Sequence, residues 1–247
     1  MSALILALVA GAVVGLALGA LGGGGSVLAV PALIYLLGFT PVAAATASLL
    51  IVTATSSTAL YAHARAGNVR WKAGSAFALS GLIPAALAGA GATRLPQAVL
   101  TAAFAGIAAL AAFKMLRPAL QNAGQQVRPV KAAATGAGLG ALTGLLGVGG
   151  GFLAVPALVS VLAFEMQAAV GTSLLVITAN SIASLATRSG GAAGLDWAVI
   201  APFTGAAILG AWDGKRLAST VSGPLLQRLF AAVLLAVAAL MLIDVFV

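Results

Sequence analysis

The segment Gly22–Leu33 reads GGGGSVLAVPAL and Gly147–Leu158 reads GVGGGFLAVPAL, so nine of twelve positions are identical at an offset of 125 residues. At the same offset, Thr46–Leu60 (TASLLIVTATSSTAL) and Gly171–Leu185 (GTSLLVITANSIASL) agree at seven of fifteen positions without a gap. The 247 residues are therefore predicted to form two related halves. Such self-similarity in an apolar chain is typical of secondary transporters, in which broken helices of the two halves meet at the substrate site.

The composition predicts an all-α, multi-pass protein of the cell (inner) membrane. The chain is 62% hydrophobic and 6% charged, with a mean hydropathy of +1.16, whereas soluble domains carry roughly 25% charged residues. The chain contains twelve Lys and Arg residues and four acidic residues, which gives a net charge of +8. The basic residues lie in short loops between apolar segments, which is the positive-inside pattern of membrane proteins and not a nucleic-acid-binding face.

The apolar segments show how the halves are organised. We expect a first repeat at 1–116, a polar linker at 117–131 and a second repeat at 132–247. A membrane span needs about 20 residues, so the segments Ser26–Gly38 and Phe152–Ala163 are too short to cross. Each follows a glycine cluster, and we expect each to be one arm of a re-entrant hairpin that is buried or lines a cavity.

Loop charges predict an inverted repeat. The basic loops His63–Lys72 and Lys114–Lys131 are expected in the cytoplasm. In the second half the positive charge moves from the first loop, Arg188–Asp196, to a later loop that contains Lys215 and Arg216. An odd number of crossings per half explains this exchange, so we expect three full spans plus one hairpin in each half and both termini outside. The alternative counts each hairpin's first arm as a separate span, which gives four spans per half and a parallel repeat.

The two glycine clusters are the first candidate substrate site. Each begins a predicted half-helix, where backbone N–H groups and the helix dipole favour an anion. Two such ends at the membrane midplane would hold an anion without a buried Lys or Arg. The alternative is that the glycines only permit close packing of helices. The candidates are Gly23, Gly24, Gly25 and Ser26 in the first half and Gly149, Gly150, Gly151 and Phe152 in the second.

Polar side chains on the next predicted helix of each half extend this site. They would donate hydroxyl groups to an oxyanion or bind a coupling ion, or else they bond the carbonyls of their own helix. The only histidine, His63, is a possible proton carrier, but its place beside a basic loop predicts an interfacial position. The candidates are Ser48 and Thr53 in the first half and Thr172, Ser173, Thr178 and Asn180 in the second.

The sequence does not predict an enzyme. It contains no phosphate-binding G-x-x-x-x-G-K-[ST] motif, and no nucleophile–base pair or cluster of metal ligands is apparent. No acid falls in the middle of a predicted span. We therefore expect no catalytic residue, no bound metal and no cofactor, with H⁺ or Na⁺ as the candidate coupling ion.

The doubled motif resembles that of the sulfite exporter TauE/SafE family, also described as toluene-sulfonate uptake permeases. It stands here as Gly22–Leu33 and Gly147–Leu158, with Ser26 as a departure where the second half has Gly151. The resemblance covers essentially the whole chain. It implies a carrier that moves sulfite, or a sulfonate such as sulfoacetate, by alternating access. An anion channel, or a carrier of a small anion without sulfur, is the alternative function.

The sequence also predicts the partners of the protein. They are the small anionic substrate and the lipid bilayer, with a homodimer as a further candidate and no nucleic acid.

Overall fold

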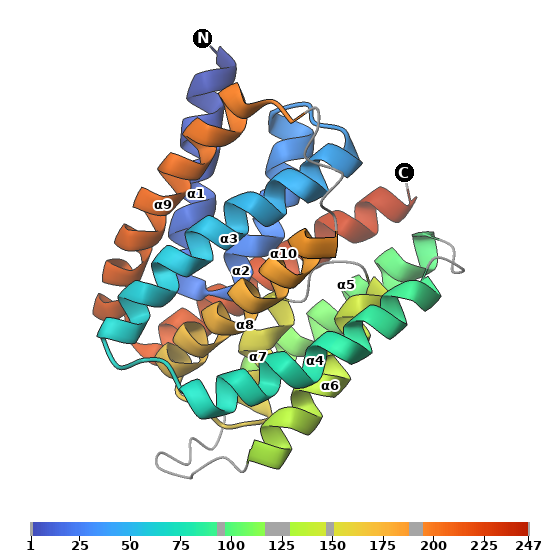
Figure 1. Cartoon of the computed structure of the whole chain (residues 1–247), viewed down its shortest axis with the longest axis vertical. Helices are drawn as coiled ribbons and strands as arrows, with labels where there is room; N and C mark the ends of the chain where they lie inside the picture. The colour runs from blue at the N-terminus through green and yellow to red at the C-terminus, as the bar shows by residue number, and fades with distance from the viewer. Residues whose placement is uncertain (1, 93–96, 117–128, 147–150, 188–194, 247) are drawn as a thin grey trace.

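The chain folds into a helical bundle, which confirms the all-α prediction (Figure 1). The computed structural model describes residues 2–92, 97–116, 129–146, 151–187 and 195–246, and every regular element in these ranges is helical. The elements are α1 (Ser2–Leu21), α2 (Gly23–Pro31), a π-helical segment η1 (Ala32–Leu36), α3 (Pro41–Arg65), α4 (Trp71–Ala92), α5 (Gln97–Leu116), α6 (Pro129–Leu146), α7 (Gly151–Ser160), α8 (Met166–Thr187), α9 (Trp197–Thr220) and α10 (Gly223–Phe246).

Within the described residues, four helices are long and apolar enough to cross a membrane. They are Ala3–Leu21, Ala43–Arg65, Met166–Ala186 and Gly223–Leu240. Large apolar side chains such as Leu110 lie exposed on the outer surfaces of the helices. A multi-pass membrane protein presents such side chains to lipid, which is as apolar as they are.

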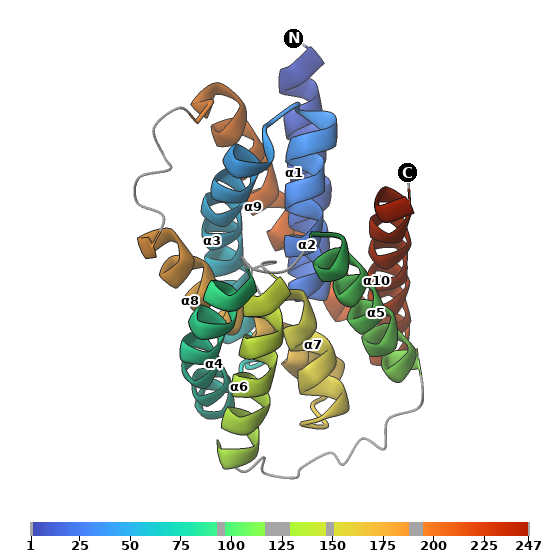
Figure 2. The same cartoon turned by 90° about the vertical axis from the view of Figure 1, so that its right-hand side faces the viewer.

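The main helix pairs join one half of the chain to the other. Helix α2 packs on α7, α3 on α8, and α5 on α10, while α1 packs along α9 and α4 along α6. Figure 2 shows α5 beside α10 on one flank of the molecule. Both clusters of buried apolar side chains contain residues from the two halves. The halves therefore share their core and are not packed as separate units.

Glycines in long helices bring two of these pairs into backbone contact. A Cβ built on Gly15 or Gly19 of α1 would collide with the carbonyl of Ala207 or Ala211 of α9. Gly81 of α4 and Gly140 of α6 approach each other in the same way. Small residues at four-residue spacing permit such close crossings in membranes. These glycines serve packing, and they lie outside the two clusters that were predicted to bind an anion.

Helix α9 is longer than the sequence predicts. The segment with Asp213, Lys215 and Arg216 is expected to be a loop, but it forms part of α9, which continues to Thr220. The reason is Gly214, which is buried against the backbone of α1 and extends the helix pair. Asp213 and Arg216 remain exposed and form an ion pair at 3.7 Å. Their charges are therefore solvated on the helix surface.

Candidate functional site

The chain reverses direction at a single glycine between α1 and α2. Gly22 has φ +68° and ψ −116°, a conformation that essentially only glycine adopts without strain. Helix α2 begins at the next residue and packs back against α1. The predicted candidates Gly23, Gly24, Gly25 and Ser26 form its first turn. The first turn of a helix presents N–H groups and the positive end of the dipole, so the helix terminus that was predicted here is present.

This glycine break lies against the second half of the chain. A Cβ built on Gly22 would lie 2.5 Å from Ser173 Oγ and 3.2 Å from the carbonyl oxygen of Val170, both on α8. Helix α2 also packs on α7, which begins at Gly151. The helix that follows the first glycine cluster therefore contacts the matching helix of the second half. Gly149 and Gly150, and the side chains of Ser26 and Phe152, lie outside the described residues.

Helices α3 and α8 meet through a pair of hydroxyl groups. Ser56 Oγ lies 2.9 Å from Thr178 Oγ1. Thr178 also reaches the carbonyl oxygen of Leu174 at 2.8 Å and Ser56 that of Thr53 at 3.4 Å, so either hydroxyl can be the donor in the bond between the helices. This bond connects one half to the other at the centre of both helices.

Three other predicted hydroxyls, those of Ser48, Thr53 and Ser173, donate to carbonyls of their own helices. Because a hydroxyl has one proton, these groups retain lone pairs and no donor. Such oxygens suit a cation or an N–H group better than they suit an oxyanion. The bonds run from Ser48 to the carbonyl of Ala45 at 2.9 Å, from Thr53 to Leu49 at 2.6 Å, and from Ser173 to Val170 at 2.8 Å.

Thr172 does not belong to this central group. Its hydroxyl accepts the backbone N–H of Arg70 at 3.1 Å, at the loop between α3 and α4. The neighbouring Gly171 lies against the backbone of Asn68, where a Cβ would come within 2.6 Å of the carbonyl oxygen. Thr172 is therefore a residue that holds the α3–α4 loop against α8.

Asn180 carries an unsatisfied polar atom. Its Oδ1 is buried and has no hydrogen-bond partner among the described residues. A buried acceptor without a partner costs about 1–3 kcal/mol. Of the predicted candidates with described side chains, Asn180 is the one with a buried oxygen that makes no hydrogen bond in the described residues, and such an oxygen suits a ligand that donates a proton or carries positive charge.

His63 is buried in the protein near the end of α3, and its interfacial position in the membrane stays a prediction. Its side chain is 2% exposed, because α3 continues past it to Arg65 and α1 covers its ring. Ring atom Nε2 lies 3.1 Å from the carbonyl oxygen of Gly19, while Nδ1 is buried without a partner in the described part of the chain. The sequence held one signal for this position, since His63 follows Ser56 by seven residues and shares its helix face.

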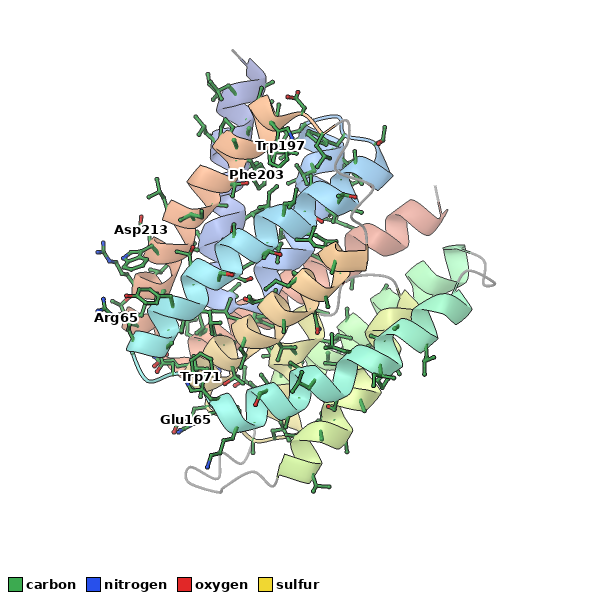
Figure 3. The ribbon with its side chains drawn as sticks, viewed as in Figure 1. Arg65, Trp71, Glu165, Trp197, Phe203 and Asp213 are labelled. Atoms are coloured by element: carbon green, nitrogen blue, oxygen red, sulfur yellow. The ribbon has the colours of Figure 1, made fainter. Side chains whose placement is uncertain are left out.

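A polar cavity of about 160 Å³ opens beside this histidine. It is lined by His63, Ala66, Asn68, Gln167, Lys215 and Ser219, with Ala218 behind them. These residues come from α3, the α3–α4 loop, α8 and α9, so the cavity also lies between the two halves. Figure 3 shows Arg65, Trp71 and Glu165 gathered at this end of the molecule and Trp197 at the opposite end.

A larger hollow of about 320 Å³ follows the groove between α1 and α9. Apolar residues such as Val13, Leu16 and Leu209 line it, and Asp213 is the one charged residue in the described part of its lining. A binding site needs several converging polar groups. This groove lacks them, so it is a lipid-facing surface and not a candidate site.

Comparison with known proteins gives consistent matches over nearly the whole chain. The family model described as "Sulfite exporter TauE/SafE" matches residues 7–241. A "Probable membrane transporter protein" of Xylella fastidiosa (strain 9a5c) is 35% identical over 245 residues, which cover 95% of this chain and 93% of the relative. Its counterpart in strain Temecula1 is 34% identical over the same shares of both chains. No solved structure shows a significant match.

Proposed function

Since this chain belongs to the sulfite exporter TauE/SafE family, we propose that it carries a small sulfur-containing anion across the cell membrane by alternating access. The substrates we propose are sulfite or a sulfonate such as sulfoacetate. The chain is a multi-pass membrane transporter, and the substrate and the mechanism are the parts that we add.

The observation that carries this proposal is the glycine break against the opposite half. Gly22 turns the chain so that α2 begins beside Ser173 of α8, and α2 packs on its counterpart α7. The first turns of α2 and α7 would bind the anion oxygens through backbone N–H groups. The hydroxyls of α3 and α8 have donated their protons to their own helices, so we assign their oxygens and Asn180 Oδ1 to the coupling ion, H⁺ or Na⁺.

The helix pairing supports an inverted repeat with one hairpin in each half. Helices α2, α3 and α5 pack on the helices at the same positions in the second half, which are α7, α8 and α10. Since α1 corresponds to α6 and α4 to α9, the pair α1–α9 corresponds to the pair α4–α6. A two-fold axis between the halves would produce this arrangement. Lys215 shares a cavity with His63, so basic residues of both halves lie at one end, which we assign to the cytoplasm.

Substitution of the glycines at the helix starts tests the proposal. Gly24→Leu and Gly150→Leu should abolish uptake of labelled sulfite or sulfoacetate into proteoliposomes, because a side chain there would fill the space of the anion. The matched control is Gly106→Leu, since Gly106 of α5 is exposed and a Cβ there meets nothing within 4 Å. If either variant inserts into the membrane normally and still takes up the anion at the native rate, the proposed anion site at the helix ends is wrong.

The same proteoliposomes separate a carrier from a channel and identify the anion. A carrier gives saturable flux that is coupled to a gradient, whereas a channel gives fast, ohmic flux. Thermal unfolding with sulfite, sulfoacetate, taurine, thiosulfate, sulfate, acetate and phosphate would identify the ligand class, because a ligand that binds only the folded state raises its stability. Stabilisation by acetate alone would contradict a sulfur-containing substrate.

A further inference from the structure

The cavity at the end of α3 has the chemistry of an oxyanion site. Among the described residues that line it, Lys215 is the only charged one and none is a carboxylate. The side-chain amides of Asn68 and Gln167 and the hydroxyl of Ser219 can donate hydrogen bonds to an anion. At about 30 Å³ per water molecule, its volume of about 160 Å³ holds roughly five waters, which is enough for a small oxyanion.

The cavity also lies near the glycine break, through the contact between His63 and Gly19. Gly19, whose carbonyl oxygen bonds His63, lies one helical turn before Gly22 at the end of α1. His63 is therefore bonded to the end of the helix that leads into the glycine break. Ala66 and Ser219 are exposed at the outer edge of the cavity.

The protonation of His63 follows from its one hydrogen bond. A carbonyl oxygen only accepts, so Nε2 donates to Gly19 at 3.1 Å. In a neutral ring the proton is then on Nε2, and Nδ1 carries a lone pair. This Nδ1 is buried, has no partner among the described residues, and belongs to a residue that lines the cavity. A lone pair that faces an anion oxygen is repelled unless a proton lies between them.

We propose that this cavity binds one small oxyanion together with one proton, which lies between Nδ1 of His63 and an oxygen of the anion. A proton from solvent binds Nδ1, and the N–H group then donates to an oxygen of the anion while every bond of the anion stays intact. A proton that arrives on the anion stays on its oxygen, and that O–H group donates to the lone pair of Nδ1. Lys215 supplies the positive charge. The inference rests on the proposed function and adds one H⁺ that binds with the anion in this cavity, separate from the ion assigned to the oxygens of α3 and α8.

Few other ionisable groups surround His63. Helices α1, α2 and α8 contain no acidic, basic or histidine residue. Helix α9 contributes Lys215 and the exposed pair Asp213–Arg216. Arg65 and Arg70, near the end of α3, are exposed, and Tyr35 of η1 is exposed as well. Because binding takes up a proton, the affinity for the anion should rise as the pH falls.

Calorimetry with methanesulfonate tests the proposal on the intact purified protein. Methanesulfonate carries no proton of its own near neutral pH, so any proton must come from solution. Titrations at about pH 8, where histidine is ordinarily neutral, are run in buffers of different ionisation enthalpy. The dependence of the heat on the buffer counts the protons taken up, and we expect close to one per anion.

Two variants distinguish the roles of the two ring nitrogens of His63. His63→Gln places an amide where Nε2 was and keeps a donor for Gly19, but it has nothing at Nδ1. His63→Asn places an N–H donor near Nδ1 and cannot take up a proton. We expect at least tenfold weaker binding for His63→Gln, a smaller loss for His63→Asn, and no proton uptake by either. Thermal unfolding and gel filtration confirm that both variants fold.

The outcomes separate this inference from the proposed function. If His63→Gln takes up a proton as the native protein does, or if the native protein binds methanesulfonate without a proton, the role of His63 is wrong and the carrier function stands. If neither methanesulfonate nor any anion of the panel binds the native protein, both proposals are wrong.

A lipid headgroup has oxyanion chemistry too, and nanodiscs distinguish it from a soluble anion. We expect methanesulfonate to bind equally in phosphatidylcholine discs and in discs that contain phosphatidylglycerol. Binding that is lost only with phosphatidylglycerol would identify the headgroup as the occupant and overturn the assignment of a soluble anion.

Discussion

The contact between Ser56 and Thr178 and the cavity beside His63 lie on the same helix, yet they differ in what their polar groups still offer. At the contact, the hydroxyl protons are donated to helix carbonyls and to each other. His63, which lines the cavity with Lys215, has a buried Nδ1 without a partner among the described residues. Polar residues in a membrane helix can therefore bond to one another or keep a polar atom free for a ligand. Only the hydrogen bonds in the structure distinguish the first kind of residue from the second.

The largest effect is expected at the glycine break that lies between these two regions. Gly22→Ala should lower the unfolding temperature and abolish transport, because its backbone conformation costs about 1–3 kcal/mol for a residue with a Cβ and the new atom meets Ser173 Oγ at 2.5 Å. Gly205→Ala is the control, since a Cβ there meets nothing within 4 Å. Adding Ser173→Ala to the Gly22→Ala variant should restore part of the lost stability. If it restores all of the lost stability, backbone strain at position 22 is not the cause of the loss.

Removal of the positive charge from the cavity is expected to have the next largest effect. Lys215→Gln should weaken anion binding about tenfold, because a charge-assisted hydrogen bond is lost, and the remaining binding should depend less on salt. Lys131→Gln removes the same charge from an exposed position on α6 and should bind as the native protein does. Equal losses in the two variants would mean that only the net charge matters.

A smaller effect is expected at Asn180, and there stability and transport should move in opposite directions. Asn180→Leu removes a buried acceptor that has no partner in the described residues, so it should stabilise the fold by about 1 kcal/mol. Transport should nevertheless fall several-fold if Oδ1 serves the coupling ion. Thermal unfolding and uptake are measured on the same preparation, and a more stable variant with native uptake would assign Asn180 no role in transport.

The smallest effect is expected at the bond between α3 and α8. Ser56→Ala and Thr178→Val should each cost about 1 kcal/mol of stability, and the double variant should cost less than their sum because both lose the same bond. Uptake should fall less than it does with Lys215→Gln. If uptake is lost entirely in either single variant, these hydroxyls bind the substrate and the contrast between the two regions fails.

Much of the fold and of the glycine break could be predicted because the signals are local. An apolar segment of about 20 residues indicates a membrane helix by composition alone. A glycine run beside a repeated motif marked the start of α2, which begins at Gly23. The end of α9 could not be predicted, because charged residues such as Lys215 resemble a loop until Gly214 is seen packed against α1.

The candidate site, like the fold, could be predicted only in part. The sequence by itself determined that the chain is a helical, multi-pass membrane transporter of the TauE/SafE family, and that glycine breaks and hydroxyl residues recur in matched places. Only the tertiary structure decided which polar atoms have partners. Thr172 binds the α3–α4 loop, and His63 lines a cavity with Lys215. The physical reason is that a hydrogen bond depends on atoms brought together from distant parts of the chain, which residue spacing along one helix does not specify.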